Sequence, residues 1–231
     1  MKKFLVLLLC FISASFQSQA QTSKWFFTFS TGPELGGPSH SVKNYLNENG
    51  FNASSEGFLI FGPTTFPYIT HYLPLLGSLG IQVTKSGSVY AIFGQSSKAE
   101  IYGYNSSSTS IKIKYSVLQF TGGYQLSFPT TRFKIGAGPS LFVLKYAQND
   151  PTLADYNNLT DKPTTIKPGL SITGRMPFGK EKKLFGIELF FNLNLAPSAK
   201  FEGFPSYNSS LVSYDVNMIN GVVGLSLAFR K

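Results

Sequence analysis

The chain of 231 residues has only one cysteine, Cys10, and it lies in an apolar stretch near the N-terminus. The remainder of the chain therefore forms no intrachain disulfide and offers no thiolate ligand to a metal ion. Histidine is almost as scarce, since His40 and His71 are the only two and no carboxylate pattern accompanies them. Metal sites need several ligands that converge on one point. We therefore expect no metal and no cofactor.

Long apolar runs are missing as well. Beyond the first twenty residues, no segment approaches the roughly 18 consecutive apolar residues of a transmembrane helix. Charged residues make up only 13% of the chain, whereas strand formers and turn formers are abundant, with 22 Phe, 12 Tyr and 22 Gly. This composition favours β-structure. If the protein lies in a membrane, it has to do so as a closed β-barrel.

Residues 1–20 have the features of a secretory signal peptide. Lys2 and Lys3 are followed by an apolar core and then by small residues that end at Ala20. We expect cleavage after Ala20, which leaves residues 21–231 as a single barrel domain.

The charge balance is positive, with 20 Lys and Arg against 11 Asp and Glu and a net charge of +9. Such an excess suits either nucleic acid or an anionic membrane surface. Export argues against nucleic acid, so we expect no nucleic-acid partner. The excess then serves either solubility or attraction to anionic lipid headgroups, and outer-membrane lipid is the expected partner.

The most informative stretch runs from Thr165 to Leu195. Apolar residues occupy the even positions from Ile166 to Phe178 and the odd positions from Phe185 to Leu195, and the other parity is mostly polar. Alternation with a period of two predicts β-strands with one apolar and one polar face. About ten residues suffice for a tilted strand to cross a bilayer. The segment therefore predicts a transmembrane β-hairpin.

Parity also restricts how the two strands of this hairpin pair. Residues paired across an antiparallel ladder point to the same face, so Glu188 pairs with either Thr173 or Arg175. Arg175 then lies opposite or diagonal to Glu188 on the polar face. We expect a structural charge pair in a barrel lumen, in a polar cluster that also contains Lys112 and Lys114.

Seven connections separate eight expected strands, and they alternate between long and short. This asymmetry is typical of bacterial outer-membrane barrels. The fold class is therefore all-β, an eight-stranded antiparallel transmembrane β-barrel with both termini periplasmic and four loops outside. The expected strands are Lys24–Thr31, Leu75–Thr84, Ser88–Tyr104, Ser110–Phe128, Arg132–Tyr146, the two halves of Thr165–Leu195, and Tyr214–Phe229.

Two of these strands have irregular patterns. In the third strand we expect Tyr90 and Ile92 to face lipid. Charged residues of the same parity further along indicate either a bulge between Gly94 and Ser97 or a register different from the one expected. In the fourth strand the apolar parity changes from odd to even, which predicts a second bulge near Val117.

The first extracellular loop contains a short predicted helix from Pro38 to Asn49. Ser39 or Ser41 is the expected cap, and Gly50 ends the helix. The loops also carry aromatic residues, which suit either a partner-binding surface or the aromatic belt at the rim of the barrel. These residues are Phe58, Phe61, Phe66, Tyr68 and Tyr207.

The C-terminal segment Gly224–Phe229 has the pattern Gly-x-x-apolar-x-aromatic. With this segment and the strand pattern, the chain resembles from Lys24 onward the small outer-membrane β-barrel family of Gram-negative bacteria, in particular its porin-like or PorT-like domains. The resemblance implies that the barrel-assembly machinery recognises Gly224, Leu227 and Phe229. In contrast to the family pattern, the chain continues beyond the aromatic residue to Arg230 and Lys231.

These observations predict a structural or adhesive scaffold that presents extracellular loops to an extracellular or envelope protein. A wide pore is not expected, because eight strands enclose little more than their own side chains. The alternatives are a narrow lumen that binds or passes a small ligand, and a soluble periplasmic barrel that binds an apolar molecule. We expect no enzyme; the enzymatic alternative, a lipid-modifying barrel, would depend on His71.

Overall fold

The computed structural model describes most of the chain. The described residues are 24–55, 73–104, 110–128, 130–149, 158–178, 184–205 and 211–230. Residues 1–20, the expected signal peptide, lie outside this part. No helix within it is long and apolar enough to cross a membrane.

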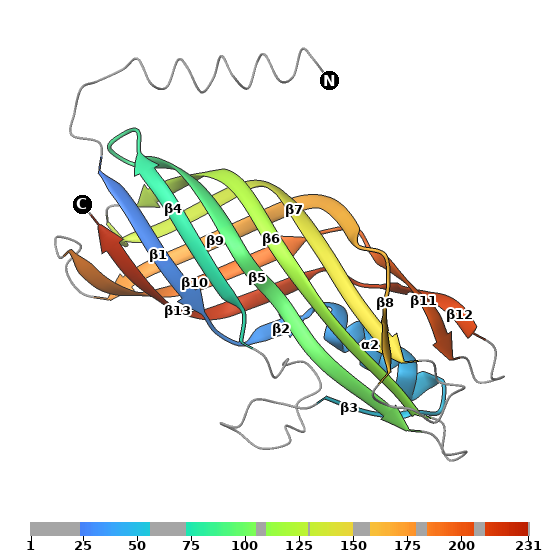
Figure 1. Ribbon diagram of the computed structural model, residues 1–231. Coiled ribbons are helices and arrows are strands. Elements are labelled where there is room, and N and C mark those ends of the chain that lie inside the picture. The colour runs from blue at the N-terminus through green and yellow to red at the C-terminus, as the bar shows by residue number, and fades with distance from the viewer. Residues whose placement is uncertain are drawn as a thin grey trace, which may run out of the picture.

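Eight antiparallel strands form a closed barrel (Figure 1). Each strand pairs with the next, and the last strand returns to the first, as Phe27 pairs with Phe229. In order around the barrel the strands are β1 (Trp25–Thr31), β4 (Leu75–Gln82), β5 (Gly87–Tyr104), β6 (Ser110–Phe128), β7 (Phe133–Asn149), β9 (Thr165–Phe178), β10 (Phe185–Leu195) and β13 (Asn220–Arg230). The expected fold class is confirmed.

The connections sort as expected. The β4–β5 and β6–β7 turns and the adjoining ends of β9 and β10 lie at the same end of the barrel as Trp25 and Arg230, which we call the turn end (Figure 1). The longer connections lie at the opposite end, called here the long-loop end. They contain β2 (Glu34–Gly36), α2 (Gly37–Glu48), β3 (Asn52–Ser55), β8 (Leu159–Asp161), β11 (Ala199–Pro205) and β12 (Leu211–Val216).

The last long connection differs from the expectation. The sequence predicts a strand that begins at Tyr214, but β11 and β12 form a separate hairpin and β13 begins only at Asn220. Tyr214 pairs with Phe201 in this hairpin. The residues of β12 alternate with the same period of two as those of β13, so the sequence alone does not separate the two strands.

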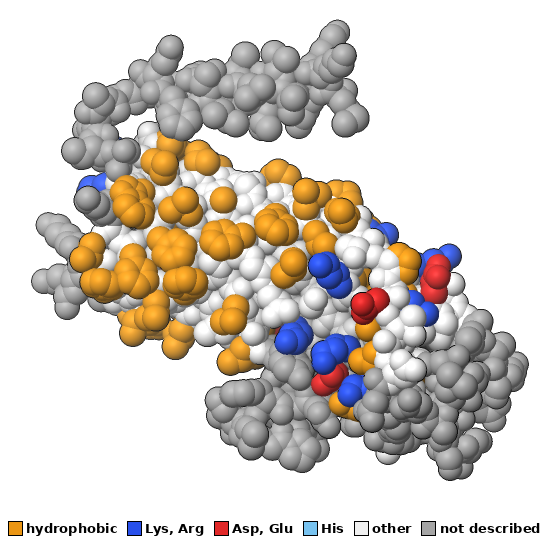
Figure 2. Space-filling view, viewed as in Figure 1, with side chains coloured by type: hydrophobic (Ala, Val, Ile, Leu, Met, Phe, Trp, Pro, Cys, Tyr) orange, Lys and Arg blue, Asp and Glu red, His pale blue; other side chains and the backbone are white. Residues whose placement is uncertain are grey.

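All eight barrel strands carry exposed apolar side chains on their outer faces, and Figure 2 shows the resulting band on one side of the molecule. Leu75 is 64% exposed, Ile166 62% and Leu225 54%, which is unusual for large aliphatic residues in water. On β6 the outward apolar positions run from Leu118 to Phe128. This stretch measures about 33 Å along the strand, and a strand tilt of about 40° reduces it to about 25 Å, the height of a lipid-facing band.

Aromatic residues gather at the turn end of this band. The rings of Phe185 and Phe229 lie 4.9 Å apart, edge to face, and those of Phe27 and Phe29 lie 4.7 Å apart. Trp25, at the start of β1, is 47% exposed. Aromatic side chains of this kind settle at the interface between hydrocarbon and headgroups.

Strand β5 has the expected bulge, between Gln95 and Ser97. Gly94 precedes it with φ +145°, and a Cβ there would lie 2.2 Å from the carbonyl oxygen of Leu75. The expected orientation of Tyr90 and Ile92 is wrong, because both are buried in the lumen, 4% and 2% exposed. Val89 and Phe93, on the other parity, face outward. Because this part of β5 is apolar on both faces, the sequence pattern does not indicate which face meets the lumen.

Strand β6 has no bulge. Its pairing with β7 keeps one register from Ile113 to Phe128. Ile111, Tyr115 and Val117 face the interior, whereas Leu118 and Phe120 face outward. The change of parity marks the place where the apolar face switches from meeting lipid to meeting the protein interior, so the expected bulge near Val117 is wrong.

Helix α2 is present, but its start differs from the expectation. Gly36 is the N-cap, no side chain caps the helix, and Ser39 and Ser41 lie inside the first turns. Pro38 has the φ of a helical residue built in, so the helix begins before either serine. Gly50, with φ +81°, follows its end.

The exposed band predicts how charged substitutions act. Leu225→Arg places a guanidinium on the lipid-facing surface, where we expect a loss of about 2–4 kcal/mol in the free energy of unfolding in vesicles. Leu184→Arg is the control, because Leu184 is equally exposed, 57%, but lies at the turn end. Urea titrations in phosphatidylcholine vesicles measure both losses. Equal effects would contradict a lipid-facing band.

Candidate functional site

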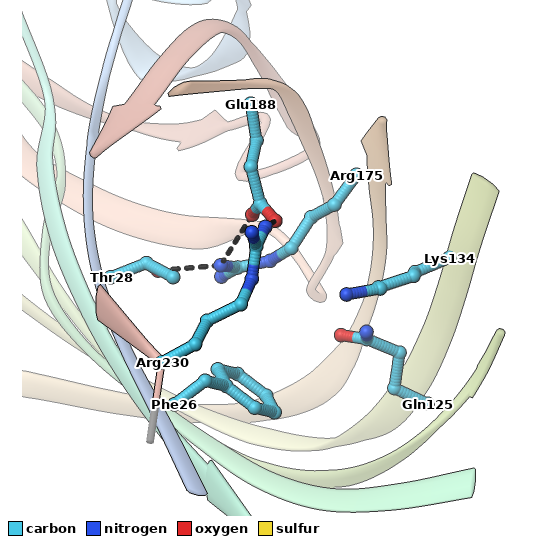
Figure 3. A pocket seen from close by; sticks show the side chains of 7 residues that line it. All are labelled: Phe26, Thr28, Gln125, Lys134, Arg175, Glu188 and Arg230. Atoms are coloured by element: carbon cyan, nitrogen blue, oxygen red, sulfur yellow. Dashed lines mark hydrogen bonds and ion pairs between the residues drawn. The ribbon is translucent and has the colours of Figure 1, made fainter. Parts of the chain in front are cut away.

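The lumen at the turn end contains a cluster of charged side chains (Figure 3). Glu188, on β10, lies 3.6 Å from Arg175 of β9 and forms an ion pair with Arg230 of β13. The two Arg175 nitrogens also donate hydrogen bonds to the Thr28 hydroxyl at 2.5 Å and the Ser78 hydroxyl at 2.7 Å. The cluster thus ties five strands together across the lumen.

The register of the β9–β10 hairpin accounts for the contact. Neither expected pairing is found: Glu188 pairs with Pro177, two residues beyond Arg175 and four beyond Thr173, and Arg175 pairs with Phe190. Arg175 and Glu188 are therefore diagonal neighbours on the inward face. The Arg175 guanidinium also lies over the Phe190 ring, 5.5 Å from its centroid.

The two lysines that the sequence assigns to this cluster are not in it. Lys112 and Lys114 lie on the outer face of β6, where Lys114 forms an ion pair with Glu100 at 2.8 Å. Lys112 lies over the Tyr102 ring, 5.1 Å from its centroid. The assumed bulge near Val117 shifted the expected parity of this part of β6 by one, which turned an outer face into an inner one.

Hydroxyl and amide side chains fill the middle of the lumen. Ser171, on β9, accepts hydrogen bonds from Ser140 at 2.7 Å and from Gln119 at 2.9 Å, and donates one to Asn194 at 2.7 Å. Asn194 donates in turn to Asn220 at 2.9 Å. All five side chains are at most 4% exposed. Paired polar groups of this kind fix the positions of the strands.

This network ends at a carboxylate that sequence reasoning missed. Glu34, on β2, is 0% exposed and accepts hydrogen bonds from Asn220 at 2.7 Å and from Ser97 at 2.8 Å. It lies in the first long connection, where no strand period indicates which side chains turn inward. The alternation of polar and apolar residues in β6, β9 and β10 does predict that Gln119, Ser171 and Asn194 face the lumen. It does not predict which hydrogen bonds these side chains make with one another.

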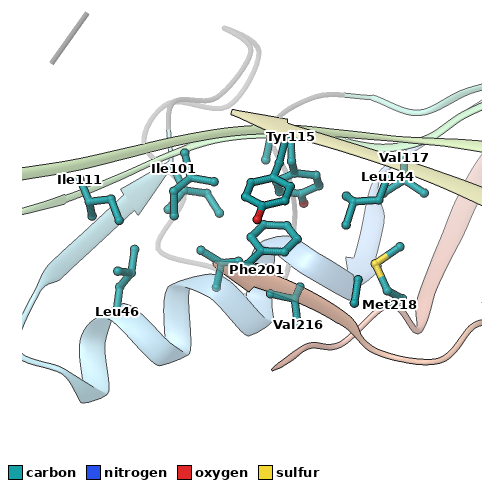
Figure 4. Packing of buried hydrophobic residues seen from close by; sticks show 14 of the residues in the cluster. Leu46, Ile101, Ile111, Tyr115, Val117, Leu144, Phe201, Val216 and Met218 are labelled. Carbon is teal, nitrogen blue, oxygen red and sulfur yellow. The ribbon is translucent and has the colours of Figure 1, made fainter. Parts of the chain in front are cut away.

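Apolar residues close the long-loop end (Figure 4). Val42 and Leu46 of α2 pack with inward-facing residues of β5, β6 and β7, and with Phe201 and Val216 of the β11–β12 hairpin. The Tyr146 and Phe201 rings stack with centroids 4.0 Å apart. We call this cluster the apolar cap. The members of the apolar cap from the long strands are Ala99, Ile101, Ile111, Ile113, Tyr115, Val117, Phe142, Leu144 and Tyr146.

The cap also includes two tyrosines from distant segments. The rings of Tyr45 on α2 and Tyr214 on β12 lie 4.1 Å apart. Burial raises the pKa of the Tyr45 phenol, and the neighbouring Tyr214 raises it further, so the Tyr45 ring stays uncharged. Tyr214 also makes a hydrogen bond to the Ser41 hydroxyl at 3.2 Å, which holds the hairpin against the helix.

Little space remains in the lumen. The hollow between Arg175, Glu188, Gln125 and Lys134 has a volume of about 10 Å³, enough for roughly one water molecule. Toward the long-loop end, Tyr115 is only 2% exposed. Side chains therefore occupy the barrel from the charged cluster to the apolar cap.

Other candidate residues are dispersed. His40 lies on α2 with its Nε2 atom 3.1 Å from the Asn44 amide. Within the described ranges, no three His, Cys, Asp or Glu residues come together as metal ligands would. His71 and the loop aromatics Phe58, Phe61, Phe66, Tyr68 and Tyr207 lie outside the described residues.

The C-terminal motif residues lie on β13 next to the closing seam. Leu227, 56% exposed, faces outward, and the Phe229 ring contacts Phe185. A Cβ at Gly224 would come 2.0 Å from the carbonyl oxygen of Thr31, so the close approach of β13 to the end of β1 requires glycine there. Recognition of these residues by the barrel-assembly machinery stays a prediction.

Solved structures show where this architecture recurs. OprG of Pseudomonas aeruginosa, an outer membrane protein, superimposes with a TM-score of 0.50 and 8% identity over 90% of this chain and 96% of that one. This is the fold of a small outer-membrane β-barrel. The attachment invasion locus protein Ail of Yersinia pestis gives a TM-score of 0.46 at 8% identity, over 91% of this chain and 100% of that chain.

The outer membrane protein AlkL, solved in DMPC bilayers, gives a TM-score of 0.40 at 14% identity over 93% of both chains. No family model matches the sequence, and no curated protein matches it. The superposition on OprG agrees with the fold built above from the pairing of the strands.

The charged cluster predicts a large effect for one uncharged substitution. Glu188→Gln leaves the buried guanidinium of Arg175, and the partly buried one of Arg230 beside it, without their carboxylate partner, and we expect it to lower the free energy of unfolding by about 3 kcal/mol. Glu202→Gln, on the exposed surface of β11, is the control and should change it by less than about 0.5 kcal/mol. Urea unfolding in vesicles compares them, and identical midpoints would show that the cluster does not stabilise the barrel.

Proposed function

We propose that the protein is an outer-membrane anchor that presents its long-loop end, outside the cell, to an extracellular or envelope protein. Both chain termini then lie on the periplasmic side. The observation that carries this proposal is the lumen as the described residues build it: their side chains leave a hollow of only about 10 Å³ at the turn end and pack together from there to the apolar cap, so the long-loop end is the principal accessible feature.

The lengths of the strands support a role for that end. Strands β5, β6 and β7 have 18, 19 and 17 residues, whereas about ten suffice to cross the bilayer. The excess projects beyond the apolar band as a curved wall, and α2 and the β11–β12 hairpin cover its inner face. A barrel that only has to insert needs no such layer.

The apolar band supports the location. Large aliphatic and aromatic side chains cover the outer wall, and the barrel has no unpaired strand edge because β13 pairs with β1. Both features suit contact with lipid, and the exposed apolar band disfavours a soluble periplasmic barrel, whose outer face would be polar. We propose no catalytic role, since the described residues bring no nucleophile and base together at an open site.

Electrical recordings test the proposal. Purified protein in planar phosphatidylcholine bilayers should give no conductance steps, because the hydrogen-bonded network and the apolar cap block the lumen. The heat-dependent gel mobility of the reconstituted protein is the control for insertion of the folded barrel. Stable steps from the unmodified protein would contradict an anchoring role and favour a narrow channel.

A further inference from the structure

A hollow lies on the wall of the barrel, away from the lumen. It has a volume of about 450 Å³ and is bordered by the ends of β5, β6 and β7 and by β8. Four of its lining residues are lysines, Lys98, Lys114, Lys145 and Lys162, and one is an aspartate, Asp161. The lining charges therefore sum to +4 − 1 = +3.

The lysines follow the apolar band directly. Along β6 and β7, Leu118 pairs with Val143, and one two-residue step further Ser116 pairs with Lys145. Ser116 also pairs with Lys98 of β5, so the two lysines flank it on one transverse row. A step of two residues is about 7 Å. The row therefore lies where hydrocarbon gives way to headgroups.

The charge is concentrated on this side of the band. In Figure 2, blue side chains gather where the orange band ends, next to the long-loop end. Lys114, on the next row, has 51% of its side chain exposed while it pairs with Glu100. Lys145 is exposed, and Lys98 and Lys162 are half-buried around the hollow. The hollow is thus open to an anion that approaches from the membrane surface.

We propose that this hollow binds the phosphate of a lipid headgroup at the long-loop end of the barrel. The ammonium groups of Lys98 and Lys145 approach the phosphate from the two sides of Ser116, and Lys162 does so from β8. The acyl chains of the same lipid lie along Leu118, Val143 and Ile166, the adjacent outward positions. A freely dissolved anion would contact only the lysines and not the apolar residues. This assignment needs the barrel to be in a bilayer but is independent of the anchoring role proposed above.

Native mass spectrometry of the full chain in detergent, titrated with dioleoyl phosphatidic acid, tests the site. Phosphatidic acid should bind more tightly than phosphatidylcholine, whose choline offsets the phosphate charge. Lys98→Gln combined with Lys145→Gln should weaken the first binding step by about thirtyfold, the loss for two lysines near an anionic surface. The heat-dependent gel mobility of the folded barrel checks that the variant is intact.

A matched double variant removes the same charge elsewhere. Lys85→Gln combined with Lys200→Gln alters exposed lysines in the β4–β5 turn and on β11, outside the hollow, and should leave binding within about threefold of the unmodified protein. An equal loss in both double variants would overturn the site in favour of net charge alone. Displacement of the lipid by millimolar inorganic phosphate would overturn the lipid assignment in favour of a dissolved anion. Equal binding of the two lipids would exclude the site.

Discussion

The pairing of every barrel strand on both sides is the constraint on which the rest of the structure depends. In hydrocarbon an unpaired N–H or C=O group costs several kcal/mol, so the seam between β1 and β13 has to close. The close contact of Gly224 with Thr31 at the end of that seam shows how tightly it closes. Closure with eight strands leaves a lumen too narrow for bulk water. The inward side chains must then satisfy one another, as Arg175 and Glu188 do at one end and Glu34 and Asn220 do further along.

The long strands pass through two environments, and their sequences change accordingly. Within the membrane the apolar face of β6 meets lipid, from Phe128 to Leu118, and the inward face is polar. Beyond it the inward face becomes apolar, from Val117 to Ile111, and packs against α2 and the hairpin. The outer face then carries the lysines. One uninterrupted strand thus belongs first to a membrane barrel and then to a water-soluble layer.

The sequence predicts the membrane part of the fold better than the rest, for a physical reason. In Thr165–Leu195 only one face is apolar, so strand bounds, parity and the closeness of Arg175 to Glu188 follow from the alternation. In β6 the same reasoning predicts a bulge near Val117, because an apolar side chain does not indicate whether it meets lipid or protein. The buried role of Glu34 and the packing of the 199–216 hairpin depend on contacts between distant segments, which no local period encodes. The lysine hollow likewise appears only when β5, β6, β7 and β8 are brought together.

The central claim is that the outer wall meets lipid while the interior is filled, and the only tryptophan of the chain, Trp25, reports on it directly. It lies on the outer face of β1 and is 47% exposed. The decisive measurement is Trp25 fluorescence in vesicles of brominated phosphatidylcholine, compared with unbrominated vesicles and with iodide in the aqueous phase. Because Trp25 lies at the boundary between hydrocarbon and headgroups, we expect strong quenching by acyl chains brominated near their carbonyl ends and weaker quenching by iodide. Strong iodide quenching with no effect of bromine at any acyl position would show that the wall faces water, and would contradict a lipid-facing barrel.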